Sequence, residues 1–491
     1  MFDNYADLIA HNARRRPRHV ALIEGERHLT YAELDLLVTR GALALRASGV
    51  AQGDILGVGL TDTLDHVVML LSIARLGAVI LPMDHRWTAE ETQRIVGHFP
   101  LRLIVLHPGQ PAPTGVEVLR IDETWHALAA AQPPEGDFPH DRDLPLLLSM
   151  SSGTTGTPKG PLLSHGKFLD RALGGSATEN DTFLLATPLY FGGGRGFTLG
   201  QLVVGGTVRL FPPPYRMEAL VEAVNTQGVT WTFLVPTQLR RLLPMAPPDR
   251  PLFPRLRLLV SSGSMLYAEE RAAVLQRLSP NFINNYSSTE GGGISVLTPA
   301  HPADKAGSVG RSIFMNEIQI VDDEHRLLPP GETGRIRHRS PTTATSFFNN
   351  PEESAKYFRD GWYYTGDLGW LDEDGFLWLA GRSKEMIIRG GVNIYPAEIE
   401  EPLLRLPEVQ DCAAVAWPAR MMGEEIALFV VPATPVTEER ILDAAREHLT
   451  PYKVPRKVFL VEDLPKNAFG KVLRAKLAAT LPDHDALFPA G

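Results

Sequence analysis

The feature that most constrains the fold is a regular alternation of helix and strand patterns near the start of the chain. Residues 31–50 have the apolar periodicity of a helix, and residues 54–60 form a short apolar run typical of a buried strand. A second helix pattern at 65–77 is followed by a strand pattern at 78–83, and residues 101–106 continue the series. This alternation predicts an α/β fold in which mainly parallel strands are flanked by helices.

Length and composition limit the classes of protein to consider. A chain of 491 residues is expected to form two or more domains. The net charge of −9 gives no general attraction to nucleic acid or to an anionic membrane, so neither is expected as a partner. The most apolar segment, 66–83, is interrupted by Arg75 and is too short to span a bilayer. The single cysteine, Cys412, suits a reducing compartment, and the first residues lack a signal-peptide core, so we expect a cytoplasmic location.

The character of the sequence changes after about residue 340. Residues 358–391 are dense in turns, aromatic residues and short strand patterns. A helix is predicted at 396–406, followed by strands at 412–419 and 426–433 and a helix at 437–449. These elements are enough for a small α+β domain at the C-terminus.

A segment rich in Gly, Ser and Thr, SSGTTGTPKG (151–160), directly follows an apolar run. Such a loop directs many hydrogen-bond donors at one point, as binding of a polyphosphate requires, and Lys159 adds a positive charge. It is not a Walker loop, because Pro158 and Gly160 replace the required Gly and Ser/Thr. Taken alone, the segment is equally typical of a flexible surface turn. Pro161, which has no N–H, predicts a strand start or an edge strand directly after it.

Four further motifs follow this loop in a fixed order. They are NYSSTE (285–290), YYTGD (363–367), GRSKEMIIRGGVNIYPAEIE (381–400) and PKNAFGKVLR (465–474). Together with SSGTTGTPKG, this ordered set resembles the adenylate-forming superfamily of acyl- and aryl-CoA synthetases, nonribosomal adenylation domains and luciferases. The resemblance spans nearly the whole chain and is strongest to aryl- or benzoate-type CoA ligases.

The resemblance implies a two-step reaction and a two-domain enzyme. A carboxylate attacks the α-phosphorus of ATP to form an acyl-adenylate, and a thiol, usually that of coenzyme A, then attacks the activated carbonyl. The implied division is an adenylating domain at 1–382, a hinge at 383–386 containing Lys384, and a mobile C-terminal lid at 387–491. The lid would turn between the two steps, so that the backbone at Gly390 and Gly391 admits the thiol.

The resemblance also assigns catalytic roles. Glu290 would anchor Mg²⁺, and the hydroxyl of Thr289 would bind the α-phosphate. Asp367 would accept both ribose hydroxyls, with Arg382 as a second ribose contact. Lys471 would bridge the substrate carboxylate and the α-phosphate. The full set of ATP-binding residues implied in this way is Ser151, Ser152, Gly153, Thr154, Thr155, Gly156, Thr157, Lys159, Gly263, Ser264, Asn285, Tyr286, Ser287, Thr289, Asp367 and Arg382.

Without the motif set, each of these residues has a plainer interpretation. Glu290 is then an exposed loop acid and Asp367 an ordinary turn residue. Arg382 is a solvated linker charge, and Lys471 is one more lysine on a basic surface.

The segment TPLYFGGGRGF (187–197) occupies the place of the acid pocket in this family. Many members have a histidine where Phe191 stands, whereas benzoate-type ligases have an aromatic residue followed by G-x-G, as here. Aromatic side chains would enclose an aromatic ring, or they simply pack the core. Arg195 would pair with a second acidic group of the substrate or, as we favour, bind a helix end or a surface carboxylate. The predicted pocket residues are Tyr190, Phe191, Gly194, Phe233, Ser261 and Gly291.

The favoured function is therefore an acid–CoA ligase that uses ATP, Mg²⁺ and coenzyme A to activate a small aryl or hydrophobic carboxylic acid. One alternative is an enzyme that loads the acid onto a separate carrier protein. Another is a non-catalytic relative that acts as a binding protein. The non-catalytic alternative is disfavoured because the polar residues to which the motifs assign catalytic roles are all present.

Overall fold

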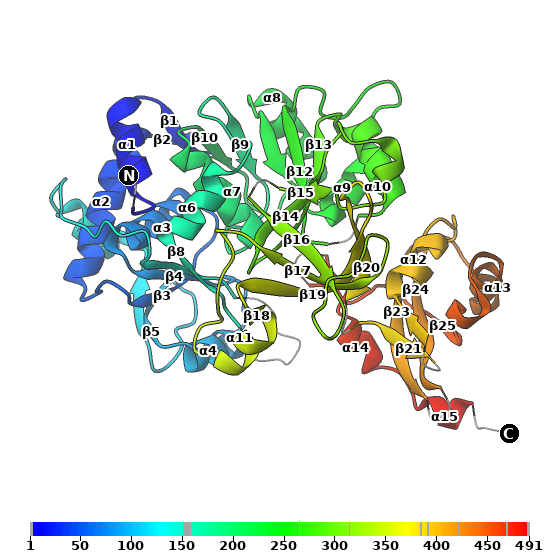
Figure 1. The fold of residues 1–491 in the computed structure, drawn as a ribbon. Helices are drawn as coiled ribbons and strands as arrows, with labels where there is room; N and C mark the ends of the chain where they lie inside the picture. The colour runs from blue at the N-terminus through cyan, green and yellow to red at the C-terminus, as the bar shows by residue number, and fades with distance from the viewer. Residues whose placement is uncertain are drawn as a thin grey trace.

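The computed structural model describes residues 3–150, 159–264, 266–313, 315–382, 385–389, 392–419, 422–467 and 470–488. A large body formed by the N-terminal four-fifths of the chain carries a smaller C-terminal domain at one side (Figure 1). The predicted α/β architecture is confirmed, with two mainly parallel sheets in the large body.

The larger parallel sheet has the strand order β15-β14-β13-β12-β11-β9-β10-β1-β2. In this order, neighbouring strands from β13 to β1 pair in parallel. The antiparallel strands β14 and β15 extend the sheet at one edge, and β2 extends it at the other. Because the parallel strands end at the same edge of the sheet, the loops that follow them converge there. The strands are β1 (Val20–Glu24), β2 (Arg27–Thr30), β9 (Thr182–Leu185), β10 (Thr207–Leu210), β11 (Trp231–Phe233), β12 (Leu258–Ser261), β13 (Phe282–Ser288), β14 (Gly292–Leu297) and β15 (Arg311–Ser312).

The second sheet has the order β6-β5-β3-β4-β7-β8 and is parallel except for the pair β7 and β8. Strand β8 lies at the edge and begins directly after Pro161, so the prediction from that proline is confirmed. The strands are β3 (Ile55–Gly59), β4 (Val79–Pro82), β5 (Leu101–Leu106), β6 (Glu117–Arg120), β7 (Pro145–Leu148) and β8 (Leu162–Ser164).

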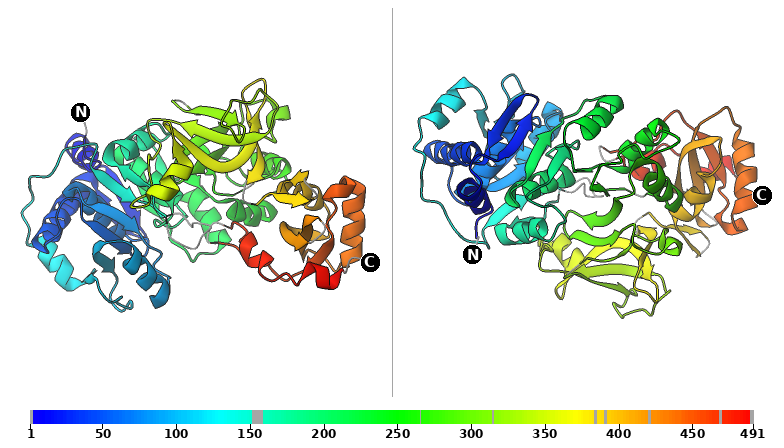
Figure 2. Two further views of the ribbon diagram at one scale, coloured as in Figure 1. Left: turned by 60° about the horizontal axis from the view of Figure 1, so that its bottom comes forward. Right: turned by 90° about the horizontal axis from the view of Figure 1, so that it is seen from above.

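The helices of the large body cover both sheets (Figure 2). Helix α2 begins at a capping box made by Thr30 and Glu33, and α3 ends at Gly77, whose φ of 76° favours glycine. Buried side chains of α2 and α3 join those of both parallel sheets in one apolar core. The helices are α1 (Asp7–Arg15), α2 (Tyr31–Ala47), α3 (Leu64–Leu76), α4 (Ala89–His98), α5 (Glu123–Ala130), α6 (His165–Leu173), α7 (Gly192–Val203), α8 (Met217–Thr226), α9 (Pro236–Leu242), α10 (Ala268–Ala273) and α11 (Pro351–Tyr357).

A third sheet, which the helix and strand alternation did not predict, completes the large body. Its pairing is antiparallel throughout the described strands, in the order β16-β17-β19-β18 with β20 beside β19. It carries the predicted ribose ligand Asp367 on β19. The strands are β16 (Glu317–Val321), β17 (Gly334–Arg339), β18 (Phe358–Arg359), β19 (Trp362–Leu371) and β20 (Leu377–Arg382).

The C-terminal domain has the predicted α+β composition and an apolar core of its own, which includes Ile387, Ile399, Leu428 and Ile441. Its sheet has the order β22-β21-β24-β23, with β25 parallel to β24. Its elements are β21 (Ile387–Arg389), β22 (Val392–Ile394), α12 (Pro396–Leu403), β23 (Val409–Ala419), β24 (Gly423–Pro432), α13 (Glu438–His448), β25 (Lys457–Leu460), α14 (Arg474–Ala478) and α15 (His484–Leu487).

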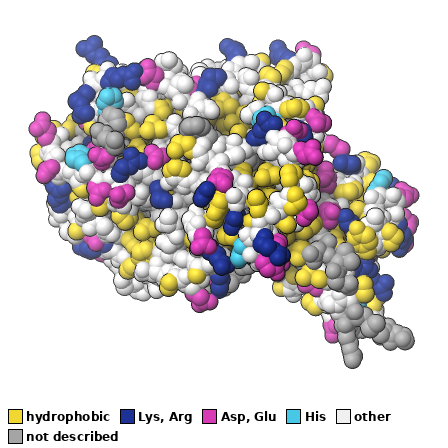
Figure 3. Space-filling model, in the orientation of Figure 1, with side chains coloured by type: hydrophobic (Ala, Val, Ile, Leu, Met, Phe, Trp, Pro, Cys, Tyr) yellow, Lys and Arg dark blue, Asp and Glu magenta, His cyan; other side chains and the backbone are white. Residues whose placement is uncertain are grey.

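Acidic and basic side chains are interspersed over the face of the molecule shown in Figure 3. Among the helices that the structure describes, none has both the length and the apolar character that crossing a membrane requires.

Candidate active site

A cleft of about 3370 Å³ lies where the large body meets the C-terminal domain. It is bordered by the loops that follow the parallel strands of the larger sheet, by the third sheet, and by the segment that precedes α14. Residues from all five predicted motifs therefore line one cavity. The predicted residues that line it are Lys159, Tyr190, Phe191, Phe233, Gly263, Ser264, Asn285, Tyr286, Ser287, Thr289, Glu290, Asp367 and Lys471.

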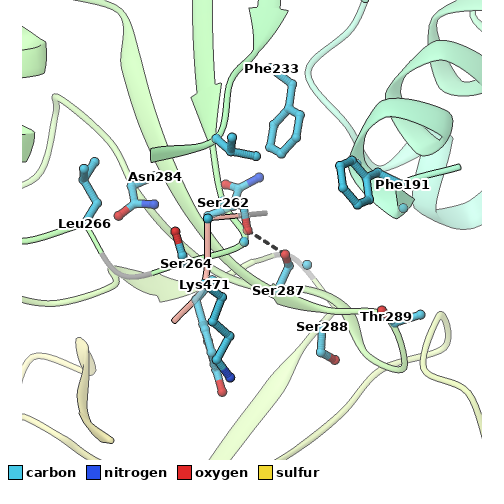
Figure 4. A pocket seen from close by; sticks show the side chains of 18 of the residues that line it. Phe191, Phe233, Ser262, Ser264, Leu266, Asn284, Ser287, Ser288, Thr289 and Lys471 are labelled. Atoms are coloured by element: carbon cyan, nitrogen blue, oxygen red, sulfur yellow. Dashed lines mark hydrogen bonds between the residues drawn. The ribbon is translucent and has the colours of Figure 1, made fainter. Parts of the chain in front are cut away.

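The predicted nucleotide end of the cleft is built by β13 and the third sheet. The hydroxyl of Tyr286 donates to Oδ2 of Asp367 at 2.5 Å, which joins the two sheets. Asp367 on β19 is the register partner of Arg382 on β20, so the two predicted ribose contacts are directly opposite residues. The hydroxyls of Ser262 and Ser287 lie 2.7 Å apart across neighbouring strands (Figure 4). This end of the cleft thus offers hydroxyl and carboxylate groups suited to a nucleoside.

The turn that carries Thr289 and Glu290 is held by Arg171 of α6. The guanidinium donates to the carbonyls of Thr289 and Glu290 at 3.2 and 2.8 Å, and to that of Thr342 at 3.1 Å. Burial lowers the pKa of Arg171 to about 10. The role of Arg171 could not be identified from the sequence, because an arginine on an amphipathic helix gives no local signal of a partner more than a hundred residues away.

The same turn presents oxygen donors of the kind that Mg²⁺ prefers. The carboxylate of Glu290, only 8% exposed, and the hydroxyl of Thr289 both belong to residues at the cleft surface. A magnesium ion needs one or two such ligands and takes the rest from phosphate and water. The residues present therefore fit the predicted ion.

Lys471 lies in the cleft at the end of a tight loop. Its backbone N–H donates to Oδ1 of Asn467 at 2.9 Å, and its Nζ lies 3.3 Å from Oε1 of Glu385. Gly470 has a φ of 75°, and a Cβ there would overlap Thr237 of α9. Glycine is required at this position because the backbone both turns in a left-handed conformation and packs on the large body.

A buried ion pair joins the lysine loop to α12. Arg474 donates to both carboxylate oxygens of Glu400 at 2.7 and 2.9 Å, and its Nε lies 3.6 Å from Glu385. Across the cleft, the hydroxyl of Tyr267 lies 3.5 Å from Glu400. Burial raises the pKa of Glu400, and Arg474 opposes that shift. This network, which could not be identified from the sequence, ties the start of α14 to α12 and contacts the large body through Tyr267.

Lys159, the last polar residue of the Gly/Ser/Thr loop, is only 6% exposed. It forms an ion pair with Glu353 of α11, and its ammonium lies 5.9 and 5.3 Å from the ring centres of Phe347 and Tyr357. Lys159 and Lys356 lower the pKa of Glu353 to about 2. The predicted phosphate-binding lysine thus has a carboxylate partner within the protein.

We expect Glu353→Gln to destabilise the protein by about 1–3 kcal/mol, because a neutral amide leaves the buried ammonium of Lys159 without a counter-charge. ATP phosphates would replace that charge, so the deficit in thermal midpoint should shrink when ATP is added. Glu352→Gln is the matched control, since Glu352 is exposed and pairs with Lys356 at the surface. Equal midpoints for the two variants would contradict the expectation.

The predicted acid end of the cleft has aromatic walls. Phe191 precedes α7 and lies 4.4 Å from Tyr190 between ring centres, and Phe233 ends β11. In Figure 4 these two phenylalanines lie on one side of Ser262 and Ser287, and Lys471 lies on the other. Apolar rings and a lysine thus lie on opposite sides of these two serines.

Three predicted pocket residues do not line the cleft, and their neighbours do. A Cβ on Gly194 would overlap the carbonyls of Thr187 and Pro188, so this glycine allows α7 to pack on the preceding segment. A Cβ on Gly291 would overlap the imidazole of His338. Ser261 is fully buried, because alternate residues of a strand face opposite sides. The residues that line the cleft in their place are Gly192, Gly193, Ser262, Gly292 and Gly293.

Contrary to the sequence-based prediction, the Arg195 guanidinium binds backbone carbonyls and a serine hydroxyl and not a surface carboxylate. It is only 1% exposed, and it donates to the carbonyls of Leu189 and Tyr190 and to the hydroxyl of Ser149 at 3.0–3.1 Å. Burial lowers its pKa to about 9. Arg195 therefore positions the segment that presents Phe191.

Asp62, which follows β3 of the second sheet, also holds the segment that presents Phe191. Its carboxylate, 3% exposed, accepts the backbone N–H of Leu189 at 2.8 Å and lies 3.9 Å from Nδ1 of His66. Burial is the main cause that raises the pKa of Asp62 to about 6, and Asp84 adds to the rise, whereas the hydrogen bond from Leu189 and the charge of Arg86 oppose it. The folded state thus binds this proton more tightly than the unfolded chain does.

We expect Asp62→Asn to raise stability at pH 7 by about 1–3 kcal/mol, since the amide oxygen still accepts from Leu189 and carries no buried charge. In the wild type, the contribution of Asp62 to stability is greatest below about pH 4 and is lost as the pH rises to about 6. Thermal midpoints at pH 4.5 and 7.5 test this, with exposed Asp65→Asn as the control. If the thermal midpoint of Asp62→Asn changed with pH as the wild-type midpoint does, Asp62 would not be the cause of the loss of stability between pH 4 and 6.

Several predicted residues lie outside the described part of the chain. They are Ser151, Ser152, Gly153, Thr154, Thr155, Gly156 and Thr157 of the loop, Lys384 of the hinge, and Gly390 and Gly391. Their roles, and the domain boundaries at 382 and 387, stay predictions.

The arrangement of the motifs is accompanied by a match to known proteins. Residues 9–348 match the family described as AMP-binding enzyme, and residues 398–471 match its C-terminal domain. The chain belongs to the AMP-binding enzyme family. The resemblance identified from the five motifs is therefore confirmed at the level of the family.

Relatives in the family align with most of the chain. The indoleacetate–CoA ligase of Aromatoleum aromaticum is 33% identical over 495 residues, which cover 95% of this chain and 96% of the relative. The feruloyl-CoA synthase of an Amycolatopsis species is 31% identical over 95% of this chain and 96% of its own. The o-succinylbenzoate CoA synthetase of Bacillus subtilis, solved with its acyl-adenylate intermediate, superposes with a TM-score of 0.88 at 26% identity, over 99% of this chain and 100% of its own.

Proposed function

We propose that this protein is an ATP-dependent acid–CoA ligase that acts on an aryl or similar hydrophobic carboxylic acid. The observation that carries the proposal is the meeting, in one cleft, of the Phe191 and Phe233 side chains with Lys471, the Thr289–Glu290 turn and Asp367. These groups match the needs of acid activation, in which an anion must approach a polyphosphate. The relatives named indoleacetate–CoA ligase and feruloyl-CoA synthase support the same reaction.

In the first step, a carboxylate oxygen of the acid forms a bond to the α-phosphorus of ATP, and the bond to the pyrophosphate oxygen breaks. Lys471 would hold the carboxylate and the α-phosphate together, because an ammonium offers three donors and a full charge. Thr289 would donate its hydroxyl to the α-phosphate, and Asp367 would hold the ribose. Glu290 would hold Mg²⁺, which supplies charge neutralisation on the phosphate oxygens when bound.

In the second step, the thiol of coenzyme A attacks the carbonyl carbon of the adenylate and loses its proton, and AMP leaves. Lys471 occupies the cleft in the structure described here, so this step would require its withdrawal. We propose that the C-terminal domain turns at residues 383–386 to bring this about, with Lys384 as the hinge residue and the backbone at Gly390 and Gly391 facing the thiol.

A panel of acids tests the proposal, with pyrophosphate release measured with and without coenzyme A and products identified by mass. We expect pyrophosphate release with at least one aryl acid, and a thioester only when coenzyme A is present. Stable adenylate without any thioester would indicate a carrier protein as the acceptor. Absence of pyrophosphate release with every acid would contradict the enzymatic function.

A further inference from the structure

Three glycines lead from Glu290 into β14, and we call residues 291–293 the glycine triplet. Gly292 and Gly293 line the cleft. A Cβ on any of the three would overlap or crowd a side chain from another segment. The atoms nearest to the three Cβ positions are Nε2 of His338 for Gly291, Nε of Arg171 for Gly292 at 2.9 Å, and Cδ1 of Ile313 for Gly293 at 3.1 Å. The triplet is thus a bare stretch of backbone that packs on three side chains and faces the cleft.

The first of these side chains, His338 on β17, is linked to the triplet through Asn316. His338 is fully buried, and its Nδ1 lies 3.0 Å from Oδ1 of Asn316. The other end of this amide donates from Nδ2 to the carbonyl of Gly293 at 2.7 Å. Because Nδ2 is the donor there, Oδ1 accepts, and the proton of a neutral imidazole lies on Nδ1. One hydrogen-bonded link therefore runs from the third sheet to the last glycine of the triplet.

The second nitrogen of His338 touches the other end of the triplet. Nε2 faces Gly291, at the place where any other residue would have its Cβ. Within the described part of the chain, this buried nitrogen has no hydrogen-bond partner. Burial lowers the pKa of His338 to about 4, and the charge of Arg171 acts in the same direction, so the ring is neutral at pH 7. A buried lone pair without a donor destabilises the fold, which an apolar side chain would not do.

Strand pairing alone does not hold the triplet in place. The ladder between β13 and β14 is irregular beside Ser287, directly where the triplet pairs with β13. Such an irregularity leaves the local position of the strand to other contacts. The N–H of Gly291 donates to the hydroxyl of Ser288 at 2.8 Å, and the link through Asn316 holds the carbonyl of Gly293.

Glu290, which precedes the triplet, is held independently of this link. Its carbonyl accepts from Arg171 at 2.8 Å and from the N–H of Ala344 at 2.9 Å. A shift of the triplet therefore need not move the residue that would bind Mg²⁺. It would move the backbone of Gly292 and Gly293, which is itself the wall of the cleft because these residues have no side chains.

We propose that His338 and Asn316 are positioning residues for the acid, which hold the glycine triplet back against the third sheet and so set the width of the acid end of the cleft. His338 acts through the triplet, because its ring is fully buried behind Gly291. This inference rests on the proposed function, since it concerns the binding of the acid which that function activates.

The test uses benzoate or indoleacetate, whichever the wild type activates faster. We expect His338→Leu and Asn316→Ala to raise the KM for this acid by about tenfold, and to leave the KM for ATP and the magnesium requirement within about threefold. His338→Gln should retain a near-normal KM for the acid, because its amide can still donate to Asn316. By calorimetry, the acyl-sulfamoyladenosine of the same acid should bind His338→Leu about tenfold more weakly, and AMP should bind it almost unchanged.

A size exchange tests the contact between His338 and Gly291 directly. Gly291→Ala alone should raise the KM for the acid, since the new methyl group would overlap the imidazole. In a His338→Ala background, the same Gly291→Ala change should have less than about a third of that effect, because the methyl group enters the space of the missing ring. Additive effects of the two changes on the KM for the acid would contradict the proposal.

His165→Leu is the matched control. His165 is also fully buried, its Nδ1 accepts the backbone N–H of Tyr5 at 2.9 Å, and its Nε2 has no partner among the described residues. Both leucine variants should lower the thermal midpoint, but only His338→Leu should raise the KM for the acid.

Equal increases in the KM values for acid and ATP would reduce His338 to a structural role and overturn the proposal. An unchanged KM for the acid in Asn316→Ala would also overturn it, and this variant serves even if His338→Leu does not fold. If the wild type releases pyrophosphate with no acid, the proposed function fails instead, so the two failures are distinguishable.

Discussion

Replacing Lys471 with alanine is expected to slow pyrophosphate release by about a thousandfold, because the transition state loses a cation placed where charge develops. The backbone of the loop should survive the change. Its hydrogen bonds run between Asn467 and the backbone of residues 470 and 471, and an alanine keeps all of them. The loss should therefore come from the ammonium alone.

Two further measurements separate this role from a structural one. The dissociation constant for ATP should change by no more than about threefold, since the other nucleotide contacts remain. Thioester formation from a supplied acyl-adenylate should also persist, because the second step is proposed to occur with the lysine withdrawn. Lys457→Ala, on β25 at a distance from the cleft, is the control. Pyrophosphate release at the wild-type rate would remove Lys471 from the mechanism.

Replacing Glu290 with glutamine is expected to slow the same step by about a hundredfold at a magnesium concentration that saturates the wild type. The amide nearly preserves shape but carries no charge, so it binds a hard divalent cation more weakly. The backbone carbonyl of Glu290 keeps its contacts with Arg171 and with the N–H of Ala344 at 2.9 Å, which should maintain the turn.

A magnesium titration gives the decisive readout for Glu290. The concentration for half-maximal rate should rise in the variant, and saturating magnesium should restore part of the rate. Glu317→Gln is the control, since Glu317 pairs with Arg339 at the surface of the third sheet. An unchanged magnesium requirement with a reduced rate would assign Glu290 a structural role in place of metal binding.

Much of the fold could be predicted because its signals are local. The helices and strands predicted within residues 31–106 lie within a few residues of their predicted bounds, since amphipathic periodicity and capping residues act over a single turn, whereas α4 (Ala89–His98) was not predicted. The third sheet was not predicted, because its antiparallel pairing joins segments whose short strands have no distinctive spacing.

The candidate site likewise contains residues that could be predicted from the sequence and residues that could not. Motif residues such as Asp367 and Lys471 could be named because their spacing is characteristic of the family. Arg171 and Glu353 could not, since a charge-paired residue shows its importance only when a distant segment folds against it. The choice of Gly194 instead of Gly193 was wrong because neighbouring helical residues differ in direction by about 100°. Packing, which the sequence does not display, decides which of them faces the pocket.

The contact between Lys471 and Glu385 connects catalysis to motion by thermodynamic linkage. Glu385 lies within the proposed hinge at 383–386, and its carboxylate reaches both Lys471 and Arg474. A substrate carboxylate that draws the ammonium of Lys471 to itself weakens the tie between the loop and the hinge. Because coupling free energies are reciprocal, a hinge that has already turned and lost this pair avoids the cost of breaking it when ATP and acid bind. One shared ion pair would thus couple substrate binding to the position of the hinge.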